Sequence, residues 1–171
     1  MKKLVSVIVS ISILLAISGC GVHRKELYLP EANNDKLYVT LADGKIHKGD
    51  GYSITIPDKK YRYESEFDDG RMEESWERIN EDDAEIKVTI YKNSDAFTAI
   101  NQFAKEHEEY IYEDLVGGPL YGASADGDVI WFHQYENEGT IYIVSREHPK
   151  NASEELQKEL ATIVKSFTFA E

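Results

Sequence analysis

Cysteine, proline and positive charge are all scarce in this sequence of 171 residues. A single Cys excludes a disulfide within the chain and zinc sites built from several thiolates. The 19 Lys and Arg residues face 32 Asp and Glu residues, so the formal net charge is −13. Because nucleic acid repels an acidic surface, the composition argues against nucleic-acid binding. The length predicts one modest globular domain with a further segment at one end.

Long apolar runs are also scarce, and the amino terminus holds the clearest one. After the basic start Met1-Lys2-Lys3, residues 4–17 contain only Leu, Val, Ile, Ala and three Ser. A helix of that length rises about 1.5 Å per residue and is therefore short for a hydrocarbon core of about 30 Å. A basic start followed by a short apolar run is typical of a secretory signal peptide.

The apolar run ends in Ile17-Ser18-Gly19-Cys20, and this is the place of the one cysteine. The segment resembles the bacterial lipobox, which implies signal-peptidase recognition of Ile17, Ser18 and Gly19, cleavage before Cys20 and a diacylglyceryl group on the Cys20 thiol. Two acyl chains are enough for stable membrane anchoring. The alternative is an uncleaved anchor in which Cys20 is an ordinary small residue.

This resemblance predicts a division of the chain into three parts. Residues 1–19 are expected to be a lipoprotein signal peptide, residues 20–34 a lipidated Cys with a flexible tether, and residues 35–171 a single globular domain. The mature protein is then held on the extracytoplasmic face of a bacterial cell membrane.

Apolar residues at every second position predict strands in most of the remaining chain. Such alternation includes Leu37, Val39, Leu41; Tyr52, Ile54, Ile56; Tyr61, Tyr63, Phe67; Met72, Trp76; and Ile86, Val88, Ile90. The turn Asp68-Asp69-Gly70 predicts a hairpin, and Asn137-Glu138-Gly139 predicts a second between runs 129–135 and 140–145. The nearly continuous apolar character of those two runs predicts a central position, covered on both faces.

Two segments change to helical spacing. Residues 94–107 have Ser94 as a candidate N-cap and an apolar stripe of Phe97, Ile100, Phe103 and Ala104. A second helix is expected to start at Asn151, with a stripe of Leu156, Leu160, Ile163, Val164 and Phe167. Roughly seven strands with two helices predict the α+β class, with a largely antiparallel sheet flanked by two helices.

The order of these segments carries a second resemblance. It runs from Gly51-Tyr52-Ser53-Ile54-Thr55-Ile56-Pro57 through Ser94-Asp95-Ala96 to a closing Ile163-Val164-Lys165-Ser166-Phe167. This order is similar to that of the PsbP-like α/β/α sandwich domains, over about Gly49 to Phe169. The resemblance implies an antiparallel sheet between helices and an accessory or docking role without an enzymatic centre.

No reaction centre, cofactor or metal site is predicted. Gly122-Ala123-Ser124-Ala125-Asp126 resembles a nucleophile elbow, but Asp126 replaces its second glycine and the segment precedes a strand. His107-Glu108 lacks the second histidine of a zinc peptidase, because position 111 is Ile111. The acidic clusters are interpreted as a solvated surface, although extracellular calcium sites can be built from such residues.

Aromatic residues make 11% of the chain and give the one candidate partner or ligand surface. Tyr and Trp combine a large contact area with a polar group, and they are also ordinary strand residues. The candidate surface consists of Tyr110, Tyr112, Tyr121, Trp131, His133 and Tyr135.

The leading hypothesis is a lipid-anchored extracytoplasmic accessory or interaction module with no catalytic centre. Its acidic surface would suit a basic envelope protein, and self-repulsion favours a monomer. The alternatives are a small-ligand or calcium-binding lipoprotein, and an envelope hydrolase whose carboxylates converge with His133 or His148 in the fold.

Overall fold

The computed structural model describes residues 38–68, 70–80, 84–113 and 120–170, without the side chains of residues 111–113 and 120. The predicted signal peptide, the lipobox-like residues Ile17 to Cys20 and the predicted tether lie outside the described residues. Among the helices that are described, none is long and apolar enough to cross a membrane.

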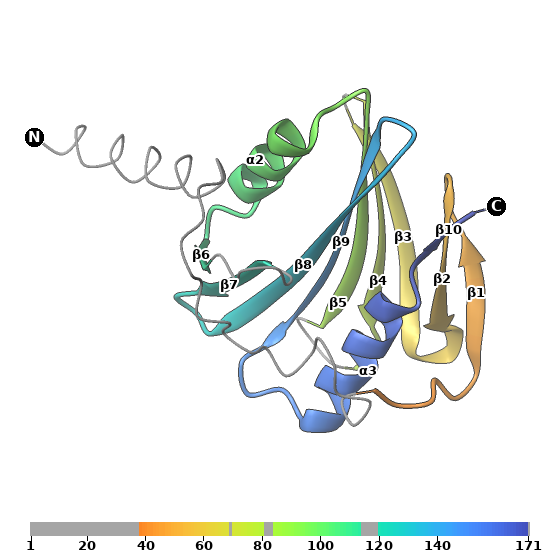
Figure 1. Ribbon diagram of the computed structural model, residues 1–171. Coiled ribbons are helices and arrows are strands. Elements are labelled where there is room, and N and C mark those ends of the chain that lie inside the picture. Colours follow the sequence, from red (N-terminus) through yellow and green to blue (C-terminus); the bar gives the residue numbers. More distant parts are fainter. Residues whose placement is uncertain (1–37, 69, 81–83, 114–119, 171) are drawn as a thin grey trace, which may run out of the picture.

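Two antiparallel sheets and two α-helices make up the described chain (Figure 1). The large sheet has the order β3-β4-β5-β9-β8-β7-β6. Its strands are β3 (Tyr61–Asp68), β4 (Arg71–Arg78), β5 (Glu85–Lys92), β6 (Tyr110–Glu113), β7 (Leu120–Ser124), β8 (Asp128–Asn137) and β9 (Thr140–Pro149). The small sheet has the order β1-β2-β10, from β1 (Gly44–Lys48), β2 (Tyr52–Pro57) and β10 (Thr168–Phe169). The helices are α2 (Ala96–Glu106), α3 (Glu154–Lys165) and a 3-10 turn, η3 (Asp58–Lys60).

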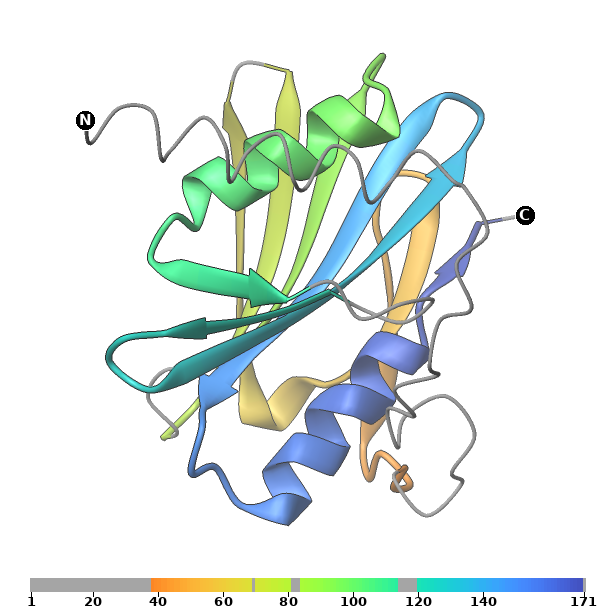
Figure 2. The same ribbon diagram turned by 60° about the vertical axis from the view of Figure 1, so that its left-hand side comes forward.

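The large sheet is covered on both faces, with α2 on one side and α3 on the other (Figures 1 and 2). The core beneath α2 includes Ala99 and Phe103 of the helix, and the core on the other side includes Leu160 and Ile163 of α3. Strand β9 belongs to both cores. Its Ile141 and Ile143 lie in the α2 core and its Tyr142 and Val144 in the α3 core. The expected central position of the 140–145 run is confirmed.

Helix α2 differs in detail from its sequence pattern. Its N-cap is Asp95, whose side chain accepts a hydrogen bond from the Thr98 backbone N–H at 2.9 Å, so the expectation of Ser94 is wrong by one position. Phe97, expected on the buried stripe, is 48% exposed. The helix is rotated so that the smaller Ala99 lies against the sheet together with Phe103.

Helix α3 follows its predicted stripe closely. Its N-cap is Ser153, two positions after the expected Asn151, and the Ser153 side chain accepts from the Leu156 N–H. Four of the five stripe residues are buried on the helix, and the fifth, Phe167, is buried just beyond its end.

The strand expected around Val39 and Leu41 is wrong, because residues 38–40 form no strand and Leu41 begins a turn. The Val39 backbone N–H instead donates to Thr162 Oγ1 of α3 at 3.0 Å, so this segment lies along the helix. The first strand is β1, in which Ile46 is 68% exposed and His47 points inward.

The architecture is therefore α+β, with a largely antiparallel sheet and two helices as the periodicity predicts. Two buried carboxylates, Glu74 of β4 and Glu159 of α3, lie against the large sheet. They are the chemically distinctive parts of the molecule.

Candidate functional site

Glu74 is a buried carboxylate in the middle of β4. It lies between Met72 and Trp76 on the face of the sheet that packs against the α3 core, and it is 2% exposed. An isolated charge in such a position would be very costly, so its partners decide whether the site is stable.

Three side chains from β1, β2 and β3 surround this carboxylate. Tyr52 donates its hydroxyl to Oε2 at 2.6 Å, Tyr63 donates to Oε1 at 2.7 Å, and His47 Nε2 lies 3.1 Å from Oε1. Burial and then the hydrogen bond to Glu74 raise the pKa of Tyr52 and of Tyr63, so both hydroxyls remain protonated donors.

Aromatic rings enclose His47. Its ring centroid lies 4.9 Å from those of Tyr63 and Trp76. The β1–β2 turn approaches the site so closely that a Cβ on Gly49 would lie 2.1 Å from the Tyr52 ring. A histidine that is oriented by a hydrogen bond to a carboxylate can act as a general base. In this chain the same contacts join the small sheet to the large one.

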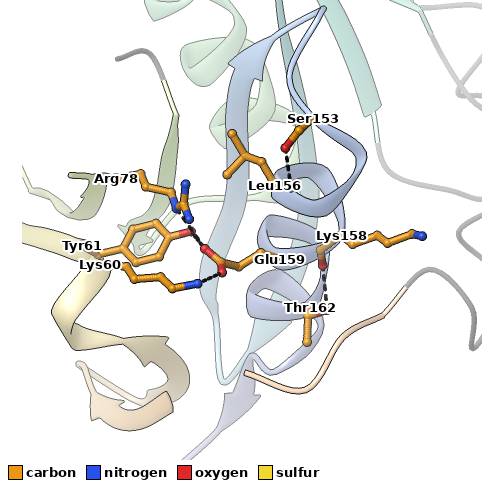
Figure 3. A network of polar contacts seen from close by, with 8 residues as sticks. All are labelled: Lys60, Tyr61, Arg78, Ser153, Leu156, Lys158, Glu159 and Thr162. Atoms are coloured by element: carbon orange, nitrogen blue, oxygen red, sulfur yellow. Dashed lines mark hydrogen bonds and ion pairs between the residues drawn. The ribbon is translucent and has the colours of Figure 1, made fainter. Parts of the chain in front are cut away.

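A second buried carboxylate, Glu159, anchors α3 to the large sheet (Figure 3). It accepts from Lys60 at 2.5 Å, Tyr61 at 3.0 Å and Arg78 Nε at 3.0 Å. Burial alone would raise the pKa of Glu159, but these three donors outweigh burial and lower it. The contacts tie the helix to β3, β4 and η3.

The predicted aromatic surface is divided between the two faces of the large sheet. Tyr110 is buried in the α2 core and donates its hydroxyl to Glu147. Tyr112 lies on β6, and its side chain is outside the part of the chain that the structure describes. Tyr110 therefore does not share a surface with the residues predicted beside it on β8.

The other four residues lie together on the α3 side, because Trp131, His133 and Tyr135 are alternate residues of β8. The Tyr121 and Trp131 rings lie 4.6 Å apart, and the Arg146 guanidinium lies 5.3 Å from the Trp131 ring. The set Tyr121, Trp131, His133 and Tyr135 is half-exposed.

A separate region on the α2 side of the large sheet is strongly acidic. We call it the acidic face. Its carboxylates are Glu64, Glu66, Glu73, Glu77, Glu85 and Glu147, which strand alternation and register place on one side. Three of the cross-strand partnerships join like charges: Glu66 with Glu73, Glu77 with Glu85, and Glu85 with Glu147. Such pairs destabilise a sheet.

Lys87 lies among these carboxylates, with Nζ 3.3 Å from Glu73 and 3.4 Å from Glu85. Arg62 lies on the same side, with its guanidinium 3.2 Å from Glu77. Burial alone would lower the pKa of Lys87, but the two carboxylates raise it overall. Burial, with Glu85 adding to it, raises the pKa of Glu147 although Tyr110 opposes this change. The acidic face thus concentrates negative charge that its own neighbours only partly neutralise.

The remaining sequence candidates have local partners. Ser124 Oγ accepts from the Asp128 N–H at 3.0 Å, as expected of a turn serine. His107 Nδ1 lies 2.9 Å from the Phe103 carbonyl, and His148 is buried with Nδ1 2.9 Å from the Pro149 carbonyl. Within the described ranges, no group of three or more His, Cys, Asp or Glu residues is placed to hold a metal ion.

Sequence reasoning missed Glu74, although a signal for it exists. Met72 and Trp76 are predicted on one face, and alternation places residue 74 on that same face. A charged residue at an inward position of a strand indicates a buried polar partner set.

Comparison with known proteins identifies no family: no family model and no curated protein matches the sequence. A solved structure from Bacteroides thetaiotaomicron VPI-5482, determined at 1.50 Å, is similar to this chain with a TM-score of 0.43 and 14% sequence identity. The match covers 76% of this chain and 50% of that one, so the chain spans about half the length of its structural neighbour.

Proposed function

We propose that this protein is a lipid-anchored, extracytoplasmic accessory module without a reaction centre, which binds a positively charged protein partner through the acidic face. The lipobox-like segment at Cys20 supports the anchor and the location. The similarity of the element order to PsbP-like domains supports an accessory or docking role.

The acidic face is the observation that carries the proposal. Like-charged carboxylates opposite one another on neighbouring strands lower the stability of the free protein. A basic partner removes that repulsion on binding and gains attraction to the same residues. Charge complementarity of this kind supplies specificity and speeds association. With a net charge of −13, the chain repels copies of itself and attracts a basic surface.

The proposal predicts binding that depends on salt and on the acidic face. We expect a Lys-rich peptide to bind the full-length chain in detergent, and the double variant Glu64→Gln, Glu66→Gln to bind about tenfold more weakly, since two charges of attraction are lost. Raising ionic strength from about 50 to about 300 mM should weaken both complexes. Fluorescence anisotropy of a labelled peptide measures the affinities.

A matched control separates the face from total charge. Glu138→Gln with Glu155→Gln also removes two negative charges, but from a turn and from the exposed start of α3. This variant should bind within about twofold of the wild type. Equal weakening by both double variants would show that net charge alone drives binding, and the assignment to the acidic face would fail.

The anchor predicts a covalent lipid on one residue. Cells fed an alkyne-labelled fatty acid should label the wild-type chain. Cys20→Ala should lose the label completely, because the Cys20 sulfur is the atom that forms the thioether bond to the diacylglyceryl group. Ser12→Ala, a change of similar size within the apolar run, should keep the label. A wild-type chain with an intact amino terminus and an unmodified thiol by mass spectrometry would contradict the anchor.

A further inference from the structure

Strand β3 is a long and exposed edge of the large sheet. It has eight residues, and the seven from Arg62 to Asp68 are all exposed. It pairs with β4 on one side, and no strand of the described chain pairs with its other side. Such an edge offers backbone groups to any extended segment that can approach it.

The register shows which residues of β3 carry those outward backbone groups. The Ile79 N–H donates to the Lys60 carbonyl at 2.8 Å, and these two residues are opposite in the β3–β4 register. Hydrogen-bonded and non-hydrogen-bonded pairs alternate along an antiparallel ladder, so Arg62, Glu64 and Glu66 bond to β4. The backbone N–H and C=O groups of Tyr63, Ser65 and Phe67 therefore point to the free side.

The side chains of β3 alternate in character as well. Tyr63 and Phe67 lie on the α3 side of the sheet and are 45% and 73% exposed. Glu64 and Glu66 lie on the opposite side and belong to the acidic face. A strand placed beside β3 would meet Tyr63, Ser65 and Phe67 on one side. On the other side it would meet Glu64 and Glu66, with Arg62 paired to Glu77 of β4.

We propose that the free edge of β3 binds an extended segment of the basic partner, as an added antiparallel or parallel strand. In that segment basic side chains at alternate positions meet Glu64 and Glu66, and the apolar side chains between them meet Tyr63 and Phe67. Backbone hydrogen bonds supply affinity, and the alternating side chains supply specificity. This inference rests on the proposed binding of a basic partner.

The excess of acidic residues on β3 disfavours a second copy of this chain as the occupant. Two β3 strands paired edge to edge would place Glu64 and Glu66 of one copy beside acidic residues of the other. Charged residues on an edge strand oppose such self-pairing, whereas a basic segment is attracted by the same residues.

The test uses Ser65, whose N–H points to the free side. Ser65→Pro removes that donor and leaves the bonds between β3 and β4 in place, as proline is tolerated on the outer side of an edge strand. Ser65→Ala loses the hydroxyl but keeps the N–H. The probe is a peptide of about eight residues with alternating Lys and Val, compared with one of equal composition with all its Lys first.

We expect the full-length wild type and Ser65→Ala to bind the alternating peptide equally, Ser65→Pro to bind it at least about tenfold more weakly, and the block peptide to bind poorly. In the wild type, hydrogen exchange at the amides of Tyr63, Ser65 and Phe67 should slow when the alternating peptide is added. This measurement does not depend on the folding of a variant.

Two adverse outcomes are distinguishable. If the alternating peptide binds in a salt-dependent way but neither Ser65→Pro nor exchange at β3 responds, strand addition is wrong and the acidic-face proposal stands. If no basic peptide binds at all, the proposed function fails together with this inference.

Discussion

Replacing Glu74 by Ala is expected to lower the free energy of unfolding by about 3 kcal/mol. The hydroxyl of Tyr52 is fully buried and donates to this carboxylate at 2.6 Å, so the variant leaves a buried donor without its acceptor. The variant also leaves a cavity between the two sheets, and His47 and Tyr63 lose the same acceptor. Urea unfolding of the full-length chain, followed by tryptophan fluorescence, measures the change.

Glu74→Gln is the matched control, because it keeps the volume of the side chain and one acceptor oxygen. We expect it to cost about half as much. If the Ala and Gln variants were both as stable as the wild type, the carboxylate would not be the junction between the small and large sheets.

Replacing Glu159 by Ala is expected to cost a similar amount, about 3 kcal/mol at neutral pH. Three donors from the opposite side of the interface, Lys60, Tyr61 and Arg78, bond to this one carboxylate. Removing one partner of a buried ion pair leaves the others desolvated and poorly compensated. Glu155→Ala, an exposed position on the same helix, should change stability by less than about 0.5 kcal/mol.

The cost of losing Glu159 should depend on pH in a definite direction. Its donors hold the pKa of Glu159 below the usual value of about 4.3. The unfolded chain therefore takes up the proton first, and the stabilisation is complete above that pH and is lost as the pH falls through the lower native value. Unfolding curves of the wild type and of Glu159→Ala should converge in strong acid. A constant difference down to that range would show that packing, and not the charge, supplies the contribution.

Local sequence patterns predicted the strands and hairpins well where one face of a strand is apolar. The turn at Glu138 and Gly139 has φ values of 50° and 74°, and two-residue hairpin turns commonly need such positive values. The runs on either side form β8 and β9, and both lie inside the large sheet as expected. Alternation is a property of the residues themselves, so it needs no knowledge of distant partners.

Features that depend on distant partners could not be predicted in this way. Val39 lies in a segment with apolar residues at every second position, but its backbone N–H donates a hydrogen bond to Thr162, which is 123 positions away. Tyr110 and Trp131 are both aromatic strand residues, yet their faces differ, because the register of β6 with β7 and of β7 with β8 decides them. The prediction of the helix caps failed for a simpler reason. Ser94 and Asp95 are both good caps, and sequence spacing does not decide between neighbours.

Because β9 contributes residues to both cores, its late place in the sequence affects how the molecule folds. Its residues pair with β5 far upstream, as in the partnership of Glu85 with Glu147, and α3 follows only afterwards. Because both cores contain residues of β9, neither core is complete until this late segment has been made. Non-local pairing of this kind slows folding. The arrangement therefore predicts that the described domain folds late, once most of its chain is available.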